Sequence, residues 1–316
     1  MKTAEVKPCF VGIDVSKETL DICILPEKKK FTVPNSDFKE LCKQLRPFKP
    51  SLIVLEPTGG YETPVLKALI KAGFKVSRES AQKIHYYAKS RGKLAKTDGI
   101  DAENIASYAQ KYVDEIKTTS LPDKESEVLR QLIARRKNLV NERAREKTRI
   151  KKPDICKEVL QSCEKRIQQL NKEISKLEKQ IQVRMKSHSE FQKKMEILQS
   201  FKGIGETTAS NLLIYLPELG QIKSKPLAAL SGVAPYQRES GQYKGEQHIR
   251  GGRKEVRTSL YMAALSAIQF NPVIKEFYER LINKGKDRMV AIVACMHKML
   301  RILNAMIAKG EEFKPI

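Results

Sequence analysis

The order of β-rich and helical segments in the first third of the chain most constrains its fold. From Phe10 to about Val113, three β-rich runs come first: "FVGIDVS", "DICILP" and "KFTVP". A helix from Asp37, the strand "SLIVLE", a helix from Glu62 and the strand "FKVSRE" follow, and further helices complete the segment. This order predicts an α/β domain in which an antiparallel three-strand meander leads into parallel strands with helical crossovers.

Such an order is typical of a ribonuclease H-like domain, which we place at residues 1–120. The fold class predicted for the whole chain is α/β plus α. It comprises this domain, a central pair of long helices and a mainly helical C-terminal domain. Because one fold hosts many activities, function has to be argued from particular residues.

The central segment, residues 121–190, has no glycine, is rich in Lys, Arg and Glu, and contains only Pro122 and Pro153. It predicts two long helices, with Pro153 at the break between them. Apolar residues recur in steps of three and four in the second helix: Leu160, Cys163, Ile167, Leu170, Ile174, Leu177 and Ile181. This heptad spacing predicts a coiled coil, formed either as a hairpin within the chain or between two chains.

The remaining residues, 191–316, return to globular, mainly helical sequence and open with "LQSFKGIGETTASNLLIYLPEL". Gly203 and Gly205 precede a helix there. The pattern fits the hairpin of helix-hairpin-helix DNA-binding units, whose backbone amides face phosphate. It fits a plain turn between two core helices equally well.

The formal net charge of +23 predicts attraction to a polyanion, most plausibly nucleic acid, with a membrane surface as the weaker alternative. No apolar run approaches the ~20 residues that span a bilayer. The N-terminus "MKTAEVKPCF" lacks the apolar core of a signal peptide. The six cysteines show no C-x-x-C spacing, so neither a zinc site nor a disulfide framework is indicated. We therefore expect a cytoplasmic protein with no membrane partner.

Four acids point to chemistry. Asp14 interrupts the apolar run of the first strand, Glu56 ends "SLIVLE", and Asp98 and Asp101 lie three residues apart at the start of a helix. A buried carboxylate is costly without a cation, and oxygen ligands of this kind suit Mg²⁺ or Mn²⁺. In a ribonuclease H-like fold these elements converge, so a metal site is predicted. Each acid taken singly has a simpler interpretation, such as Asp14 or Asp98 capping a helix.

Five segments, taken in their order, resemble a known family over nearly the whole chain. They are "GIDVSK", "EPTGGYE", "KTDGIDAENIA", "SFKGIGETTA" and "ALSGVAPYQRESGQYKGEQHIRGGRKEVRTSLYMAAL". This is the "IS-one-ten" family of DEDD-type transposases of bacterial insertion sequences, which act as RNA-guided bridge recombinases. The resemblance implies that Asp14, Glu56, Asp98 and Asp101 are the metal-binding tetrad of a RuvC-like domain. It further implies a nucleophilic serine, a composite site between protomers of a dimer or tetramer, donor and target DNA, a structured bridge RNA, and a nucleoid-associated bacterial protein.

We place the nucleophile at Ser240 in "QRESGQYKG". This serine precedes Gly241 in a polar stretch, and phosphate-neutralising cations lie nearby in sequence: Arg238, Arg250, Arg253 and Arg257. Ser231 in "LSGVAP" is the rival, but it follows the apolar "PLAAL" and is expected to be buried. His248 lies in the same basic stretch.

A second basic segment, "QKIHYYAKSRGKLAKTD", mixes aromatic and cationic residues suited to stacking on bases and contacting phosphate. Its members are His85, Tyr86, Tyr87, Lys89, Arg91 and Lys93. A half-exposed helix without ligand is the plain alternative.

Three other functions compete with a transposase. A RuvC-like junction nuclease would use the four acids and a metal-activated water, with no covalent serine step. A sugar kinase or actin-like ATPase would share "GIDVSKETL", but the second glycine-rich phosphate loop that it needs is not evident. A nucleic-acid-binding module would explain the charge but not the four acids.

Overall fold

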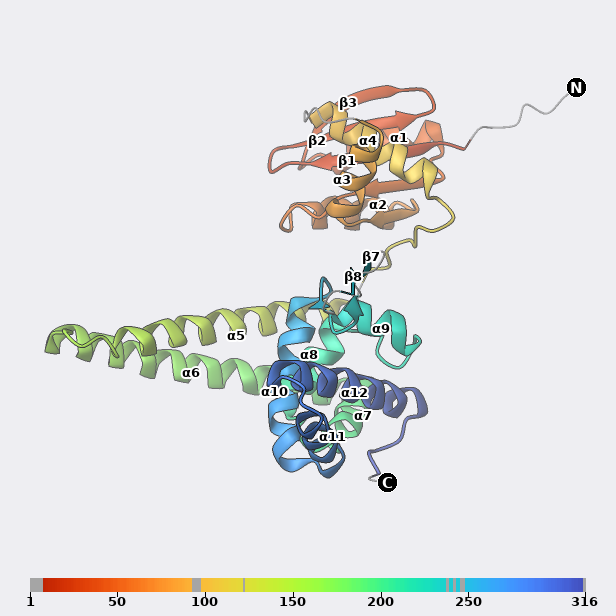
Figure 1. Ribbon diagram of the computed structural model, residues 1–316. Helices are drawn as coiled ribbons and strands as arrows, with labels where there is room; N and C mark the ends of the chain where they lie inside the picture. The colour runs from red at the N-terminus through yellow and green to blue at the C-terminus, as the bar shows by residue number, and fades with distance from the viewer. Residues whose placement is uncertain are drawn as a thin grey trace, which may run out of the picture. The chain divides into compact units, whose positions relative to one another are not determined.

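The computed structural model (Figure 1) describes residues 8–92, 98–121, 123–236, 239–240, 243–244 and 248–314. The chain divides into two compact units, residues 1–122 and 123–316. The long helices that we expected as a separate central segment belong to the second unit, because they pack on its other helices.

A five-stranded mixed sheet forms the centre of the first unit. β1 (Phe10–Val15), β2 (Thr19–Leu25) and β3 (Lys29–Pro34) form an antiparallel meander. β4 (Leu52–Leu55) and β5 (Val76–Arg78) continue the sheet in parallel from β1, which gives the order β3-β2-β1-β4-β5. The predicted meander and parallel strands are confirmed, and the order is that of a ribonuclease H-like fold.

Helices cover both faces of this sheet, because alternate strand residues are apolar on either side. Val11 and Ile13 pack in a core with Leu41 of α1 (Phe38–Leu45) and Leu69 of α2 (Glu62–Lys71). A short 3-10 helix, η1 (Arg46–Phe48), follows α1.

On the other face, Phe10 and Val54 pack with Ile84 and Ile105, which belong to α3 and α4 respectively. The bounds of these helices are Ala81–Ser90 for α3 and Asp98–Lys111 for α4.

Two long helices, α5 (Lys124–Arg149) and α6 (Lys157–Ser187), lie side by side and form an arm of the second unit (Figure 1). They run antiparallel, since ion pairs join Glu125 to Arg184 near one end and Glu142 to Arg166 farther along. Between these ion pairs, Leu139 of α5 is buried with Leu170 and Ile174 of α6. The heptad stripe is therefore buried in a hairpin within one chain.

The other helices of the second unit pack around a large apolar core that includes Phe201, Leu260 and Met299. They are α7 (Ser189–Gln199), α8 (Glu206–Tyr215), α9 (Ser224–Ser231), α10 (Lys254–Phe270), α11 (Pro272–Asn283) and α12 (Arg288–Lys309). Two short strand pairs lie between α9 and α10: β6 (Pro235–Tyr236) with β9 (His248–Ile249), and β7 (Glu239–Ser240) with β8 (Tyr243–Lys244).

The turn between α7 and α8 contains Gly203, whose φ of 109° lies in the left-handed region. A Cβ there would come within 2.7 Å of the Cβ of Ala267 in α10. Glycine is therefore required by packing, which supports the interpretation of this segment as a turn between two core helices.

α12 meets the length and composition of a membrane-spanning helix, although half of its apolar window is buried. By length and composition alone, this helix differs from the expectation that no apolar run approaches the ~20 residues of a membrane span. Met299 and Leu303 are fully buried in the core of the second unit, so α12 serves here as a core helix.

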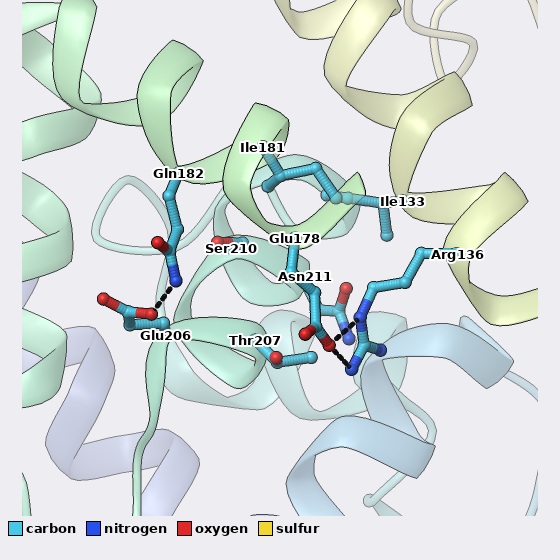
Figure 2. A pocket seen from close by; sticks show the side chains of 9 residues that line it. All are labelled: Ile133, Arg136, Glu178, Ile181, Gln182, Glu206, Thr207, Ser210 and Asn211. Atoms are coloured by element: carbon cyan, nitrogen blue, oxygen red, sulfur yellow. Dashed lines mark hydrogen bonds and ion pairs between the residues drawn. The ribbon is translucent and has the colours of Figure 1, made fainter. Parts of the chain in front are cut away.

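A small cavity of about 120 Å³ lies where the hairpin meets α8 (Figure 2). Four of its polar side chains form two pairs with one another. Arg136 donates to Glu178 at 2.7 Å through Nε, and Gln182 donates to Glu206. These pairs join α5 to α6 and α6 to α8, so we assign them a role in fixing the hairpin on the bundle.

Candidate active site

The strand register brings Asp14 and Glu56 to the same edge of the sheet. β1 and β4 are parallel, with Gly12 opposite Val54 and Ile13 opposite Leu55. The next step along both strands aligns Asp14 with Glu56. Side chains alternate along a strand, so both acids follow the face on which Gly12 and Val54 lie, the face covered by α4.

α4 lies directly on β1 at Gly12. A Cβ on Gly12 would be 2.2 Å from the carbonyl oxygen of Ala102 and 2.3 Å from the amide nitrogen of Ala106. Only glycine permits this approach. Residues later in α4, such as Tyr108, pack with Phe10 at the start of β1. The first turn of α4, with Asp98 and Asp101, therefore lies toward the end of β1 that carries Asp14.

The turn after Asp14 leads into a strand, so the helix-cap interpretation of Asp14 is wrong. Ser16 Oγ accepts from the backbone N–H of Thr19 at 2.8 Å and of Glu18 at 3.2 Å, and β2 begins at Thr19. This turn pairs Asp14 with Asp21 across the antiparallel strands.

Asp21 is an acid that the sequence analysis missed. It is half-buried and accepts a hydrogen bond of 2.5 Å from Thr32 Oγ1 of β3. Its position opposite Asp14 depends on the length of the β1–β2 turn, which a motif search does not reveal. The alternation in "TLDICIL" was the available signal.

The four predicted ligands, Asp14, Glu56, Asp98 and Asp101, are all carboxylates, the donors that Mg²⁺ and Mn²⁺ prefer. Asp14 and Asp101 are half-buried, and Asp14, Glu56 and Asp101 each take part in an interaction within the fold. Among the described side chains, no three potential ligands are gathered closely enough to hold a metal ion. The side chain of Asp98 lies outside the described residues.

The loop that follows Glu56 is held by a buried carboxylate, Glu62, which is 3% exposed. Glu62 accepts from the N–H groups of Thr58 at 3.1 Å and Gly60 at 2.9 Å, and from Arg78 at 3.2 Å. Burial by itself would raise the pKa of Glu62, but these hydrogen bonds and the nearby guanidinium outweigh it and lower the pKa. Glu62 thus fixes the turn next to a predicted ligand.

In the second unit, Ser240 lies in a short hairpin. Its backbone pairs with Tyr243, and this hairpin lies between β6 and β9 in the chain. The side chain of Ser240 and all of Arg238 lie outside the described residues.

The ribbon of β6 and β9 is anchored by a contact between glycines at its base. A Cβ on Gly252 would lie 2.1 Å from the backbone nitrogen of Gly232. Both glycines have φ in the left-handed region. The chain just after α9 and the chain just before α10 are therefore held together at Gly232 and Gly252.

Ser231, the rival serine, is fully buried at the end of α9. Its Oγ has no hydrogen-bond partner in the part of the chain that the structure describes. The expected burial is confirmed, and a phosphodiester cannot reach this hydroxyl without rearrangement of the fold.

The arginines near Ser240 differ in availability. Both terminal nitrogens of Arg253 donate to Glu218, at 2.5 and 2.7 Å, and Nη1 also donates to the Tyr215 carbonyl at 2.9 Å. Arg253 was predicted to contact nucleic acid; its donors are used inside the fold, so we assign it a structural role. Arg257 donates to the Gly251 carbonyl, and Arg250 is exposed.

The basic segment of α3 is divided in the same way. Lys89, His85 and Tyr86 are exposed. Tyr87 instead packs in an aromatic group with Tyr108 of α4 and Tyr112, the residue after α4. Its ring centroid lies 5.7 Å from that of Tyr108 and 5.8 Å from that of Tyr112.

Arg91 is tied to this group. Its guanidinium carbon lies 5.6 Å from the Tyr87 ring centroid, and Nη1 donates to Ser107 Oγ. Lys89 is thus exposed on α3, whereas Arg91 links α3 to α4. Lys93 lies outside the described residues.

Comparisons with known proteins identify the class. A family model described as "Transposase" matches residues 11–153, and one described as "Transposase IS116/IS110/IS902 family" matches residues 195–279. Proteins named pilin gene-inverting protein, from Moraxella lacunata and Moraxella bovis, are each 30% identical over 96% of this chain and 97% of their own length. An insertion element IS110 protein of Streptomyces coelicolor is 29% identical over 36% of this chain and 29% of its own.

The RuvC protein of T. thermophilus, solved in complex with a Holliday junction substrate, matches 35% of this chain and 99% of its own. The identity is 16% and the TM-score 0.30.

The chain is thus a transposase whose first unit has the strand order of a ribonuclease H-like fold. It belongs to the IS116/IS110/IS902 family of transposases, the family that its sequence motifs resemble.

Proposed function

We propose that this transposase cuts and rejoins DNA through a covalent bond to Ser240, with a divalent metal ion held by Asp14, Glu56, Asp98 and Asp101. The observation that supports the metal site most is the convergence of β1, β4 and the first turn of α4 at one sheet edge. When bound, Mg²⁺ or Mn²⁺ would supply charge stabilisation for the oxygens of a phosphodiester under attack.

In the serine step, Oγ of Ser240 loses its proton and forms a bond to the scissile phosphorus. The bond from phosphorus to the leaving oxygen breaks, and that oxygen takes up a proton and becomes a free hydroxyl. The number of phosphodiester bonds is conserved, so the reverse reaction with a new hydroxyl rejoins DNA without ATP. Relatives named for inverting a pilin gene support this proposal, since inversion requires every broken strand to be rejoined.

We further propose that the partners are donor DNA, target DNA and a structured bridge RNA, and that the protein acts as a dimer or tetramer in the bacterial cytoplasm, in association with the nucleoid. The net charge of +23 supports nucleic-acid partners. Sequencing of RNA that co-purifies with the protein tests the guide, and recovery of no discrete RNA species would contradict it.

The decisive experiment compares two serine variants. Ser240→Ala should bind DNA but form no denaturant-resistant adduct, whereas Ser231→Ala should form it at the level of the unmodified protein. Ser231→Ala is a suitable control because its hydroxyl is buried. An adduct with Ser240→Ala would refute this choice of nucleophile. Cleavage without any adduct would favour the metal-dependent junction nuclease.

A further inference from the structure

A cavity of about 1030 Å³, open to solvent, lies in the second unit. α9, α11, α12 and the β6–β9 ribbon form its walls. We refer to it as the α9–α12 cavity. Its volume lies at the upper end of the range typical of ligand sites, roughly 300–1,000 Å³.

One part of the cavity wall is apolar and contains an aromatic ring. Phe277 of α11 lines the cavity, as do Met289, Val290 and Val293 of α12. Met289 and Val290 are 56% and 52% exposed, respectively. Exposed apolar side chains that line one cavity together, unlike those scattered singly over a surface, mark ligand or partner sites.

The rest of the lining is cationic. Lys225, Arg280, Lys298 and Arg301 line the cavity together with two histidines, and no carboxylate does so in the described part of the chain. Arg280 and Lys298 lie 5.3 and 4.5 Å from the Phe277 ring centroid. None of the four cations forms an ion pair among the described residues, so over this part of the chain the lining carries an excess of positive charge. The occupant should therefore be an anion with an apolar, stackable part.

The cavity also lies close in sequence to the predicted nucleophile. Pro235 of β6 lines it and is five residues from Ser240. Five residues span at most about 17 Å, and a stacked DNA strand rises roughly 3.4 Å per nucleotide. A DNA strand with its phosphate at Ser240 would thus have a nucleotide within about five steps of the cavity.

We propose that the α9–α12 cavity binds an unpaired nucleotide of the DNA strand that carries the scissile phosphate. The base stacks against Phe277 and the apolar wall, and the phosphate lies on the cationic rim formed by Arg280 and Arg301. This assignment to DNA rests on the proposed function of Ser240. Stacking on an aromatic side chain and phosphate neutralisation are the two terms that hold single strands to protein.

The test measures binding of a thymidine oligonucleotide with one central 2-aminopurine to the full chain by fluorescence. The protein has no tryptophan, so its own emission interferes little. The double variant Arg280→Ala/Arg301→Ala should weaken binding at least tenfold. The control Lys275→Ala/Lys309→Ala removes the same charge from exposed positions of the same two helices outside the cavity and should change the Kd less than twofold.

A second pair tests the apolar wall. Val290→Asp should weaken binding and reduce the change in 2-aminopurine emission that accompanies binding. Val183→Asp, the same substitution at an exposed position of α6 outside the cavity, should do neither. Equal effects within each pair would overturn the proposal. A change in oligomer size with unchanged DNA affinity would also overturn it, because a second copy of the chain would then be the occupant. The same holds if the cavity variants weaken binding of a uridine RNA but not of DNA.

Failure of this inference and failure of the proposed function are distinguishable. Ser240→Ala should retain the dependence of affinity on Arg280 and Arg301. If the unmodified protein forms the adduct while the cavity variants match their controls, only the inference fails. If no adduct forms but the cavity dependence remains, the serine mechanism fails and the nucleotide site stands.

Discussion

Individual carboxylates in the first unit have different roles that their burial and partners define. Asp14 and Asp101 are half-buried beside a helix N-terminus, whereas Glu103, also on α4, forms an ion pair of 2.7 Å with Lys30. Asp14→Asn and Asp101→Asn should abolish adduct formation with the fold retained, because the amide cannot replace an ionised metal ligand. Glu103→Gln should stay active. EDTA should abolish adduct formation by the unmodified protein, and full activity in EDTA would refute the metal site.

Glu62 offers a test of stability at the same scale. Its pKa is lowered in the folded state, so the stabilisation is present above the pKa of the unfolded chain and is lost as pH falls through the folded value. Glu62→Gln should lower the free energy of unfolding by about 1–3 kcal/mol at neutral pH, since the N–H groups of Thr58 and Gly60 and the Arg78 guanidinium lose a buried, charged acceptor. The difference from the unmodified protein should shrink in acid. Urea titrations at several pH values measure it, with Glu18→Gln, at an exposed position of the same unit, as control. A difference independent of pH would contradict this account.

Among the elements, the α5–α6 hairpin has the clearest mechanical role. Leu170 and Ile174 are 0% and 4% exposed and pack on Leu139 of the same chain. Leu170→Lys/Ile174→Lys should therefore open the hairpin, because loss of each buried side chain costs about 2–5 kcal/mol and an ammonium is buried in its place. Hydrogen exchange should accelerate in both helices. Lys172→Ala/Lys176→Ala, at exposed positions of α6, should leave exchange unchanged. Protection retained in α5 would refute intramolecular packing.

For the whole molecule, the net charge of +23 should dominate affinity for nucleic acid. The logarithm of the binding constant for duplex DNA should fall linearly with the logarithm of salt concentration, with a slope of roughly −0.9 per phosphate neutralised. Filter binding from low to moderate salt measures the slope. Affinity that does not change with salt would contradict the electrostatic account.

Assembly is testable by complementation. If acids of one protomer act on a phosphate attacked by Ser240 of another, a mixture of Asp14→Ala and Ser240→Ala chains should form the adduct that neither forms alone. The adduct should be on the Asp14→Ala chain, which keeps the serine. A tag that changes the size of one chain identifies it on a denaturing gel. A mixture without adduct, when each variant still binds DNA, would exclude a site shared between protomers.

The sequence by itself determined the strand and helix order of the first unit, the long helices, the positive charge and the burial of Ser231. These follow from local periodicity and composition, which the chain carries without reference to distant residues. Only the tertiary structure decided four other features. They are the position of Asp21 opposite Asp14, the hydrogen bonds of Glu62 to the loop after Glu56, the pairing of Arg253 with Glu218, and the burial of Leu170 in the hairpin. Each depends on which distant segment supplies the neighbouring atoms, and a charge or an apolar stripe looks the same in sequence whether that neighbour is solvent, ligand or the chain itself.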